Sequence, residues 1–153
     1  MVATYTSNLR LTKQGDNDNP NTWGQVVNNQ VIELIEDAIS GVATIDITGV
    51  SDVDLSTSVV NGGVDSARSM VLDLTGVIGA NINLIVPSVQ KVYLVRCGFT
   101  GSYTVTIKPA GGSSGIVVNP TNTKVLFTNG TSIYEIAGNV NQALFLQVAN
   151  NLS

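Results

Sequence analysis

The sequence predicts a mainly β fold: an antiparallel β-sandwich or jelly-roll-like domain that follows an N-terminal arm with one α-helix. Two observations lead to this prediction. Residues 42–137 form short β-branched runs in which apolar and polar side chains alternate, each bounded by Gly, Pro or Asn, as in strands with one wet face. Turns recur there about every 8–12 residues, a spacing typical of sandwiches and barrels.

Only one segment has the period of a helix. After a loop at residues 15–21, apolar side chains recur every three or four positions from residue 23 to residue 38. We expect Asn21 or Thr22 to cap the first turn, and Gly41 to end the helix in a left-handed conformation. The predicted docking residues on this helix are Trp23, Val27, Val31, Leu34 and Ile35.

Two side-chain groups of this helix carry further expectations. Trp23 is expected to anchor the helix to the core, because a large ring buries much apolar surface. Glu33, Glu36 and Asp37 lie near the C-terminal end, where negative charge opposes the helix dipole. This small cost indicates a partner for those carboxylates.

The remaining chain is divided into strands by its turn residues. Asn129-Gly130 lies between two alternating runs and predicts a type I′ hairpin. Residues 139–148 fit either a last strand or a short helix, and no internal repeat is evident. The arm and docking helix are assigned to residues 1–41, and the β domain, compact with the arm, to 42–153. The expected strands are 43–48, 53–60, 69–75, 80–86, 91–97, 102–108, 115–118, 123–128 and 131–137.

Composition excludes several classes of protein. Charged residues make up 12% of the chain, against about 25% in typical soluble domains, whereas Asn, Thr and Ser fill 44 of 153 positions. Such a chain suits a subunit whose faces meet other subunits. The net charge of −4 and seven scattered basic residues argue against nucleic acid as a partner. Apolar runs are too short for membrane insertion, and no secretion leader is visible.

Residues suited to catalysis or to metal binding are scarce. The sequence contains no histidine, which removes Ser-His-Asp and Cys-His catalysis and the commonest metal ligand. Asp16 and Asp18 have the spacing of calcium ligands, but an EF-hand would require Gly at Asn21 and Glu at Val27, so a solvated turn is favoured. We expect no enzyme activity, no cofactor and no bound metal.

Three other sets of residues are candidates for a functional role. Asp52 and Asp54 could form a glycosidase pair, although alternation favours a wet strand edge. Trp23, Tyr93, Tyr103 and Tyr134 could stack on sugars, but aromatic residues make up only 5% of the chain. The single cysteine, Cys97, excludes an intrachain disulfide and is expected to be a small buried strand residue.

Several segments, in a fixed order, resemble parts of the tail and fibre proteins of marine and freshwater bacteriophages. The resemblance covers about residues 4–136, and it implies a virion structural role, trimerisation and attachment through the N-terminal region. Those proteins often continue into longer distal segments, so a chain ending at Ser153 also suits an adaptor, a spike base or a decoration protein. The segments are 5–11, 21–24, 32–39, 67–72, 85–88, 91–95 and 129–134.

The function expected from these observations is a structural component of a phage virion, made in the host bacterial cytoplasm. The leading hypothesis is a trimeric tail-fibre or head-spike subunit or adaptor, whose partners are copies of itself and other tail or capsid proteins. One alternative is a capsid decoration (cement) protein on the head shell. Another, from a different class, is a carbohydrate-binding receptor module whose partner is a host surface glycan.

Overall fold

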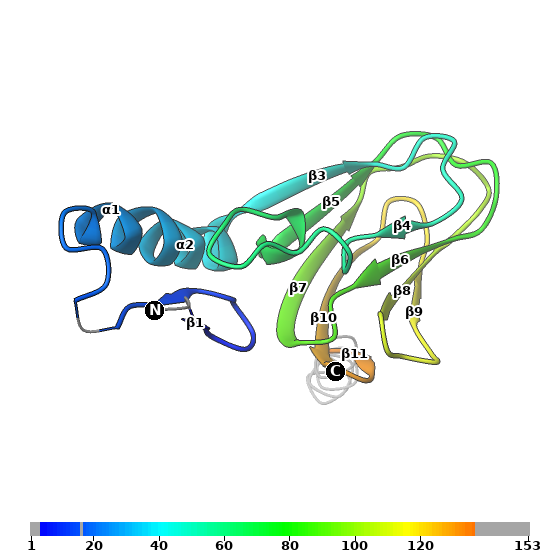
Figure 1. Cartoon of the computed structure of the whole chain (residues 1–153). Coiled ribbons are helices and arrows are strands. Elements are labelled where there is room, and N and C mark those ends of the chain that lie inside the picture. The colour runs from blue at the N-terminus through cyan, green and yellow to red at the C-terminus, as the bar shows by residue number, and fades with distance from the viewer. Residues whose placement is uncertain (1–3, 16, 137–153) are drawn as a thin grey trace, which may run out of the picture.

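The computed structural model describes residues 4–15 and 17–136 (Figure 1). The segment at 139–148, expected to form a strand or a helix, lies outside these residues. The elements in chain order are β1 (Thr4–Tyr5), β2 (Thr12–Lys13), α1 (Trp23–Val27), η1 (Asn28–Ile32), α2 (Glu33–Ser40), β3 (Val42–Asp46), β4 (Val53–Asp54), η2 (Ser66–Arg68), β5 (Val71–Thr75), β6 (Ile82–Val86), β7 (Gln90–Cys97), β8 (Val105–Pro109), β9 (Ile116–Val118), β10 (Thr123–Asn129) and β11 (Ile133–Glu135).

The predicted helix is confirmed, with a changed pitch in its middle. The elements α1, η1 and α2 follow one another without a break from Trp23 to Ser40, and η1 is a π-helix. Figure 1 shows this helix extending away from the sheets at the end where β3 begins. Among the described residues, no helix has the length and apolar character needed to cross a lipid bilayer.

Both predicted ends of the helix differ in detail. Thr22 is the N-terminal cap residue, but no side chain makes a capping hydrogen bond there. Gly41 has φ −66° and is extended, so the left-handed turn predicted for it is wrong. The glycine is needed because a Cβ at this position would lie 2.5 Å from the backbone oxygen of Asp37.

A mainly β architecture is confirmed, and the strands β3 to β11 lie at the predicted places. They form a five-stranded sheet in the order β11-β10-β7-β5-β3 and a four-stranded sheet in the order β4-β6-β8-β9. The shortest of them is β4, because only Val53 and Asp54 of the expected strand 53–60 pair. The small hairpin of β1 and β2 precedes the helix.

The pairing of the central strands corrects the prediction of an antiparallel sandwich or jelly roll. The pairs β3–β5, β5–β7, β4–β6 and β6–β8 are parallel, and only β7–β10, β10–β11 and β8–β9 in these two sheets are antiparallel. Alternating strands usually indicate antiparallel sheets, because most parallel sheets are covered on both faces. Here parallel strands also keep one face in the core and one in water.

From β3 to β8 the chain runs alternately through the two sheets, as in a β-solenoid, and it then forms the antiparallel pairs β8–β9 and β10–β11. Val71 pairs with Leu94 in one sheet, and Leu84 pairs with Ile107 in the other. Side-chain contacts follow the same shift of 23 residues, for example from Thr104 to Asn81. The second coil is therefore 23 residues long, whereas paired residues across the first coil are 29 and 31 residues apart, so the coils recur in the structure although no repeat is evident in the sequence.

The first coil is longer than the second because of one connection. The strands β4 and β5 are joined by residues 55–70, whereas residues 87–89 join the corresponding strands β6 and β7. We call residues 55–70 the coil-one loop. It carries η2 and two buried charged residues, Asp65 and Arg68, which are described below.

Both sheets contribute side chains to one hydrophobic core. Inward residues stack on their equivalents in the next coil, which buries each of them against a neighbour of similar kind. The sheets leave little of these side chains exposed to water. The stacked sets are Ile45, Leu74 and Cys97; Ala43, Leu72 and Val95; Ile82, Val105 and Val118; and Leu84, Ile107 and Ile116.

The hairpin predicted at Asn129-Gly130 is present, with a different turn. Thr128 pairs with Ile133, and the backbone N–H of Asn129 donates to the oxygen of Ser132 at 3.1 Å, so the tip of the hairpin is Gly130 and Thr131 in place of the predicted Asn129 and Gly130. Gly130 has the expected positive φ of 96°. Asn129 does not, and its side-chain oxygen accepts hydrogen bonds from the backbone N–H groups of Thr131 and Ser132.

Candidate functional site

The five predicted docking residues of the helix do not share one environment. Leu34 is buried, Val27 and Val31 are half-buried, and Ile35 is exposed. Trp23 is 56% exposed, so the interpretation of Trp23 as an anchor to the core is wrong. The helix is therefore apolar on two sides, one that packs against the molecule and one that faces water.

The outward side of the helix carries a row of aliphatic residues, of which only Ile35 was among the docking residues predicted from the sequence. Ile32, Ile35, Ile39 and Val42 are all exposed, with Ile39 at 69% and Val42 at 60%. The spacing of three and four residues places Ile32, Ile35 and Ile39 along one side of the helix, and Val42 begins β3 just after the extended Gly41. We call these four residues the helix stripe. Contiguous exposed apolar residues of this kind mark interaction surfaces.

A second candidate site lies where the N-terminal hairpin meets the coil-one loop. The backbone N–H of Gly62 donates to the oxygen of Arg10 at 2.8 Å. The Thr12 hydroxyl donates to Gln30 of η1 at 2.7 Å. These contacts join the arm to both the helix and the β coils, so the three parts share one junction.

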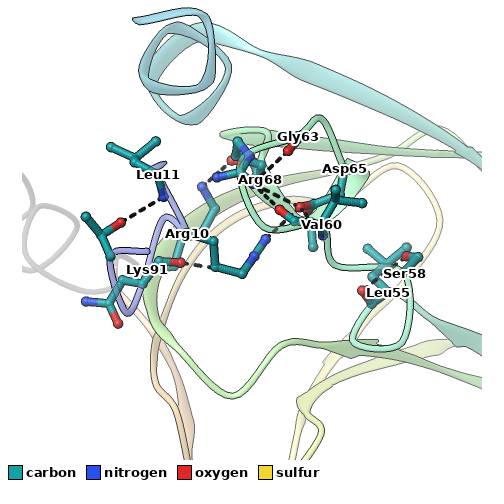
Figure 2. Close-up of polar contacts among 12 residues, drawn as sticks. Arg10, Leu11, Leu55, Ser58, Val60, Gly63, Asp65, Arg68 and Lys91 are labelled. Atoms are coloured by element: carbon teal, nitrogen blue, oxygen red, sulfur yellow. Dashed lines mark hydrogen bonds and ion pairs between the residues drawn. The ribbon is translucent and has the colours of Figure 1, made fainter. Parts of the chain in front are cut away.

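At the centre of this junction, two arginines share one carboxylate. Asp65 Oδ2 accepts hydrogen bonds from Arg10 Nη2 at 2.7 Å and from Arg68 Nη2 at 3.2 Å. Arg68 Nη2 also donates to the backbone oxygens of Val60 and Gly63, each at 2.8 Å. Figure 2 shows the two guanidinium groups converging on Asp65 inside the coil-one loop. The loop is thereby closed around a charged side chain.

The junction also includes two residues of β7. The Lys91 amine donates to the backbone oxygen of Arg68 and lies 5.2 Å from the centre of the Tyr93 ring. The Tyr93 hydroxyl donates to the oxygen of Ala67 at 3.0 Å. We call Arg10, Asp65, Arg68, Lys91 and Tyr93 the junction cluster.

Burial determines the electrostatics of this cluster. The side chains of Arg68 and Asp65 are 0% and 1% exposed. Loss of hydration lowers the pKa of Arg68, and burial with the nearby Arg68 and Arg10 lowers the pKa of Lys91 to about 8. Burial likewise raises the pKa of Tyr93. Three cationic groups surround one carboxylate, which holds the loop in place through charge-assisted hydrogen bonds.

The carboxylates weighed as metal ligands or catalysts serve local turns. Asp18 Oδ2 accepts from the backbone N–H of Gly15 at 3.0 Å, while Asp16 lies outside the described residues. Within residues 4–15 and 17–136, no group of three or more acidic or cysteine side chains is placed to hold a metal ion.

Asp52 and Asp54 are also engaged by neighbouring groups. Asp52 accepts hydrogen bonds from the backbone and side chain of Asn83, which lower its pKa. Asp54 accepts from the N–H and hydroxyl of Ser56. A general acid needs a raised pKa, and Asp52 lacks that property. Both residues are exposed to solvent, as expected for the solvated strand edge that the sequence favours.

Cys97 is a buried residue of β7, as the sequence predicted. Burial raises the pKa of its thiol to about 11. A thiol with a raised pKa forms little of the reactive thiolate, so the side chain serves the core.

The junction cluster was missed by sequence reasoning, although one signal existed. Asp65 and Arg68 are three residues apart in a chain with few charges, a spacing that favours ion pairs in a helical turn. Nothing in the sequence indicated that Arg10 and Lys91 meet them. Comparisons of this chain with protein-family models, with curated proteins and with solved structures gave no match.

Proposed function

We propose that this chain is a structural component of a bacteriophage virion, a trimeric tail-fibre or head-spike subunit or adaptor that attaches through its N-terminal region. The observation that carries the proposal is the helix stripe. An apolar row exposed on a helix that extends away from the β coils (Figure 1) needs a partner to remove it from water. The junction supports the proposal because Arg10 pairs with Asp65 of the coil-one loop and Thr12 donates to Gln30 of the helix, which joins the arm to the β coils and to the helix.

The proposed class of the β region combines two descriptions. Its two sheets about one core resemble the layers of a sandwich, while the parallel coil connections are those of a short solenoid. Solenoids present side chains at regular intervals along an axis. A rigid unit of this kind suits a stalk or an adaptor better than a pocket for a small molecule.

Two measurements test the proposal. Sedimentation equilibrium should give three times the 16.0 kDa mass of one chain, and a monomer at micromolar concentration would contradict the trimer. Immunogold labelling of purified phage particles with an antibody against the chain should mark the tail or the head. Particles that bind no antibody, from a phage that encodes this chain, would contradict the virion role.

The alternative of a capsid decoration protein is separated from this proposal by copy number. A decoration protein covers the head shell and is present in many more copies than a tail fibre. Quantitative mass spectrometry of purified particles, normalised to the major capsid protein, measures the copy number of this chain and so separates the two roles.

A carbohydrate-binding module is a second candidate because two tyrosine rings are exposed. Tyr103 follows the turn after β7, and Tyr134 of β11 stacks on Phe127 with ring centres 6.4 Å apart. Exposed rings stack on the apolar faces of sugars. Glycan-array binding that is lost in Tyr103→Ala or in Tyr134→Ala would favour this role, whereas binding unchanged in both variants would exclude these rings.

A further inference from the structure

Acidic and basic residues are segregated along this chain. Residues 14–67 contain nine of the 11 acidic residues and no lysine or arginine. All seven basic residues lie in 1–13 and 68–153, together with two acids, Asp73 and Glu135. The helix and the first coil therefore form an acidic half, and the later coils a basic one.

The helix stripe belongs to the acidic half. Glu33 and Glu36 are exposed on the same helix, and within the described residues neither forms an ion pair. Their charges also lie toward the C-terminal end of the helix, where the dipole disfavours them. An exposed apolar row thus lies beside carboxylates that form no ion pair within the described residues.

A second copy of the helix is a poor occupant for this surface. Packing two stripes together would bring Glu33 and Glu36 of both chains close to each other. Residues 14–67 offer no lysine or arginine to separate them, and like charges beside a helical interface are destabilising.

We propose that the helix stripe binds an amphipathic helix of another protein, one with an aliphatic face bordered by lysine or arginine. Its aliphatic side chains would cover Ile32, Ile35, Ile39 and Val42, and its cations would pair with Glu33 and Glu36. Such pairs speed association and select the partner by charge. This inference rests on the proposed function in one respect only, namely that the partner protein is part of the phage particle.

The first experiment uses a synthetic peptide as the probe. It has the length of helix 23–40, leucine on one face and lysine on the others, and a matched peptide carries glutamate in place of lysine. Trp23, the only tryptophan, reports binding because it is exposed on the same helix. The lysine peptide should shift its emission to the blue and bind more weakly as salt is added, while the glutamate peptide should not bind.

Variants then locate the binding surface. Ile39→Ser should weaken binding of the lysine peptide about tenfold, whereas Val117→Ser, a change of another exposed aliphatic residue, on β9, should have no effect. Glu33→Gln and Glu36→Gln should each weaken binding about two- to fivefold. Glu135→Gln, in the basic half, is the matched control and should leave the affinity unchanged.

Three outcomes would overturn the inference. Equal binding of both peptides would show that charge does not select the partner. Equal losses in Ile39→Ser and Val117→Ser would place the site elsewhere. An oligomer that Ile39→Ser converts to a monomer would show that a second copy covers the stripe. A monomer that binds the lysine peptide would contradict the proposed trimer and leave the inference standing, so the two failures are distinguishable.

Discussion

The buried Arg68 and the partly exposed Arg10 share a single carboxylate, that of Asp65. Asp65 is 1% exposed and pairs with Arg10 and Arg68 through the same oxygen. Asp65→Asn should lower the free energy of unfolding by about 3–5 kcal/mol, because it leaves buried cations without their counter-charge. Urea unfolding measures the change.

The control for this prediction is an ion pair at the surface. Glu135→Gln removes the exposed partner of Lys124 and should cost less than about 1 kcal/mol. Similar losses in the two variants would show that burial does not set the strength of the junction cluster.

Lys91 predicts a dependence of stability on pH. Its pKa is about 8 in the folded chain and 10.5 in the unfolded chain, so the folded state binds fewer protons between these values. The free energy of unfolding contributed by Lys91 should therefore rise with pH across this window.

The measurement compares the wild type with Lys91→Met at several pH values. The comparison is necessary because Cys97, whose pKa is raised to about 11, acts in the opposite direction above pH 9. The difference in unfolding free energy between the two proteins should change in favour of the wild type as pH rises. Parallel pH curves would contradict the assignment.

Among the elements, the contact between the N-terminal hairpin and the coil-one loop depends on Gly62. Gly62 has φ +63°, and a Cβ there would lie 2.5 Å from the Thr12 hydroxyl oxygen. Gly62→Ala should therefore displace the arm, which limited proteolysis would detect as faster cleavage before residue 14. Gly49→Ala is the matched control, since Gly49 has φ +66° and open space around its Cα. Both substitutions place an alanine at a positive φ and carry the same backbone strain, but only Gly62→Ala should expose the arm to the protease.

The sequence was sufficient to locate most elements and insufficient to pair them. Alternation found the strands because each has one face in the core, and a three-to-four period found the helix. Alternation does not distinguish parallel from antiparallel partners when every coil has a wet outer face. The equivalence of Leu72 with Val95, and of Leu74 with Cys97, preserves hydrophobic character without residue identity, so the repeat stayed hidden.

The candidate sites were predicted less well, for a physical reason. Trp23 and Leu34 both lie on an apolar helix, and only packing decides that one faces water and the other the interior. Arg10 and Lys91 are distant in sequence from Asp65, so their convergence depends on the complete fold. Long-range contacts of this kind leave no local pattern in a single sequence.

For the whole molecule, the shift of 23 residues between the second and third coils predicts tolerance of added coils. Duplicating residues 71–93 in tandem should insert one further coil in register, because each solenoid coil contacts only its neighbours. The product should keep β-type circular dichroism and unfold in a single thermal transition. Duplicating residues 71–82 alone should disrupt folding, because it shifts every later strand out of register. Equal behaviour of the two insertions would contradict the assigned coil.

The outer edge of the first coil has a consequence for how this protein behaves at high concentration. β3 and β4 lie at the edges of their sheets, and such edges can nucleate polymers by adding strands from other molecules. Asp46 and Asp54 stand on these strands, and hydrogen bonds to Thr48 lower the pKa of Asp46. Repulsion between these carboxylates on different molecules should therefore prevent the growth of filaments. Protonation of the carboxylates in acid should allow filaments to form, and light scattering recorded during titration to low pH would detect their formation.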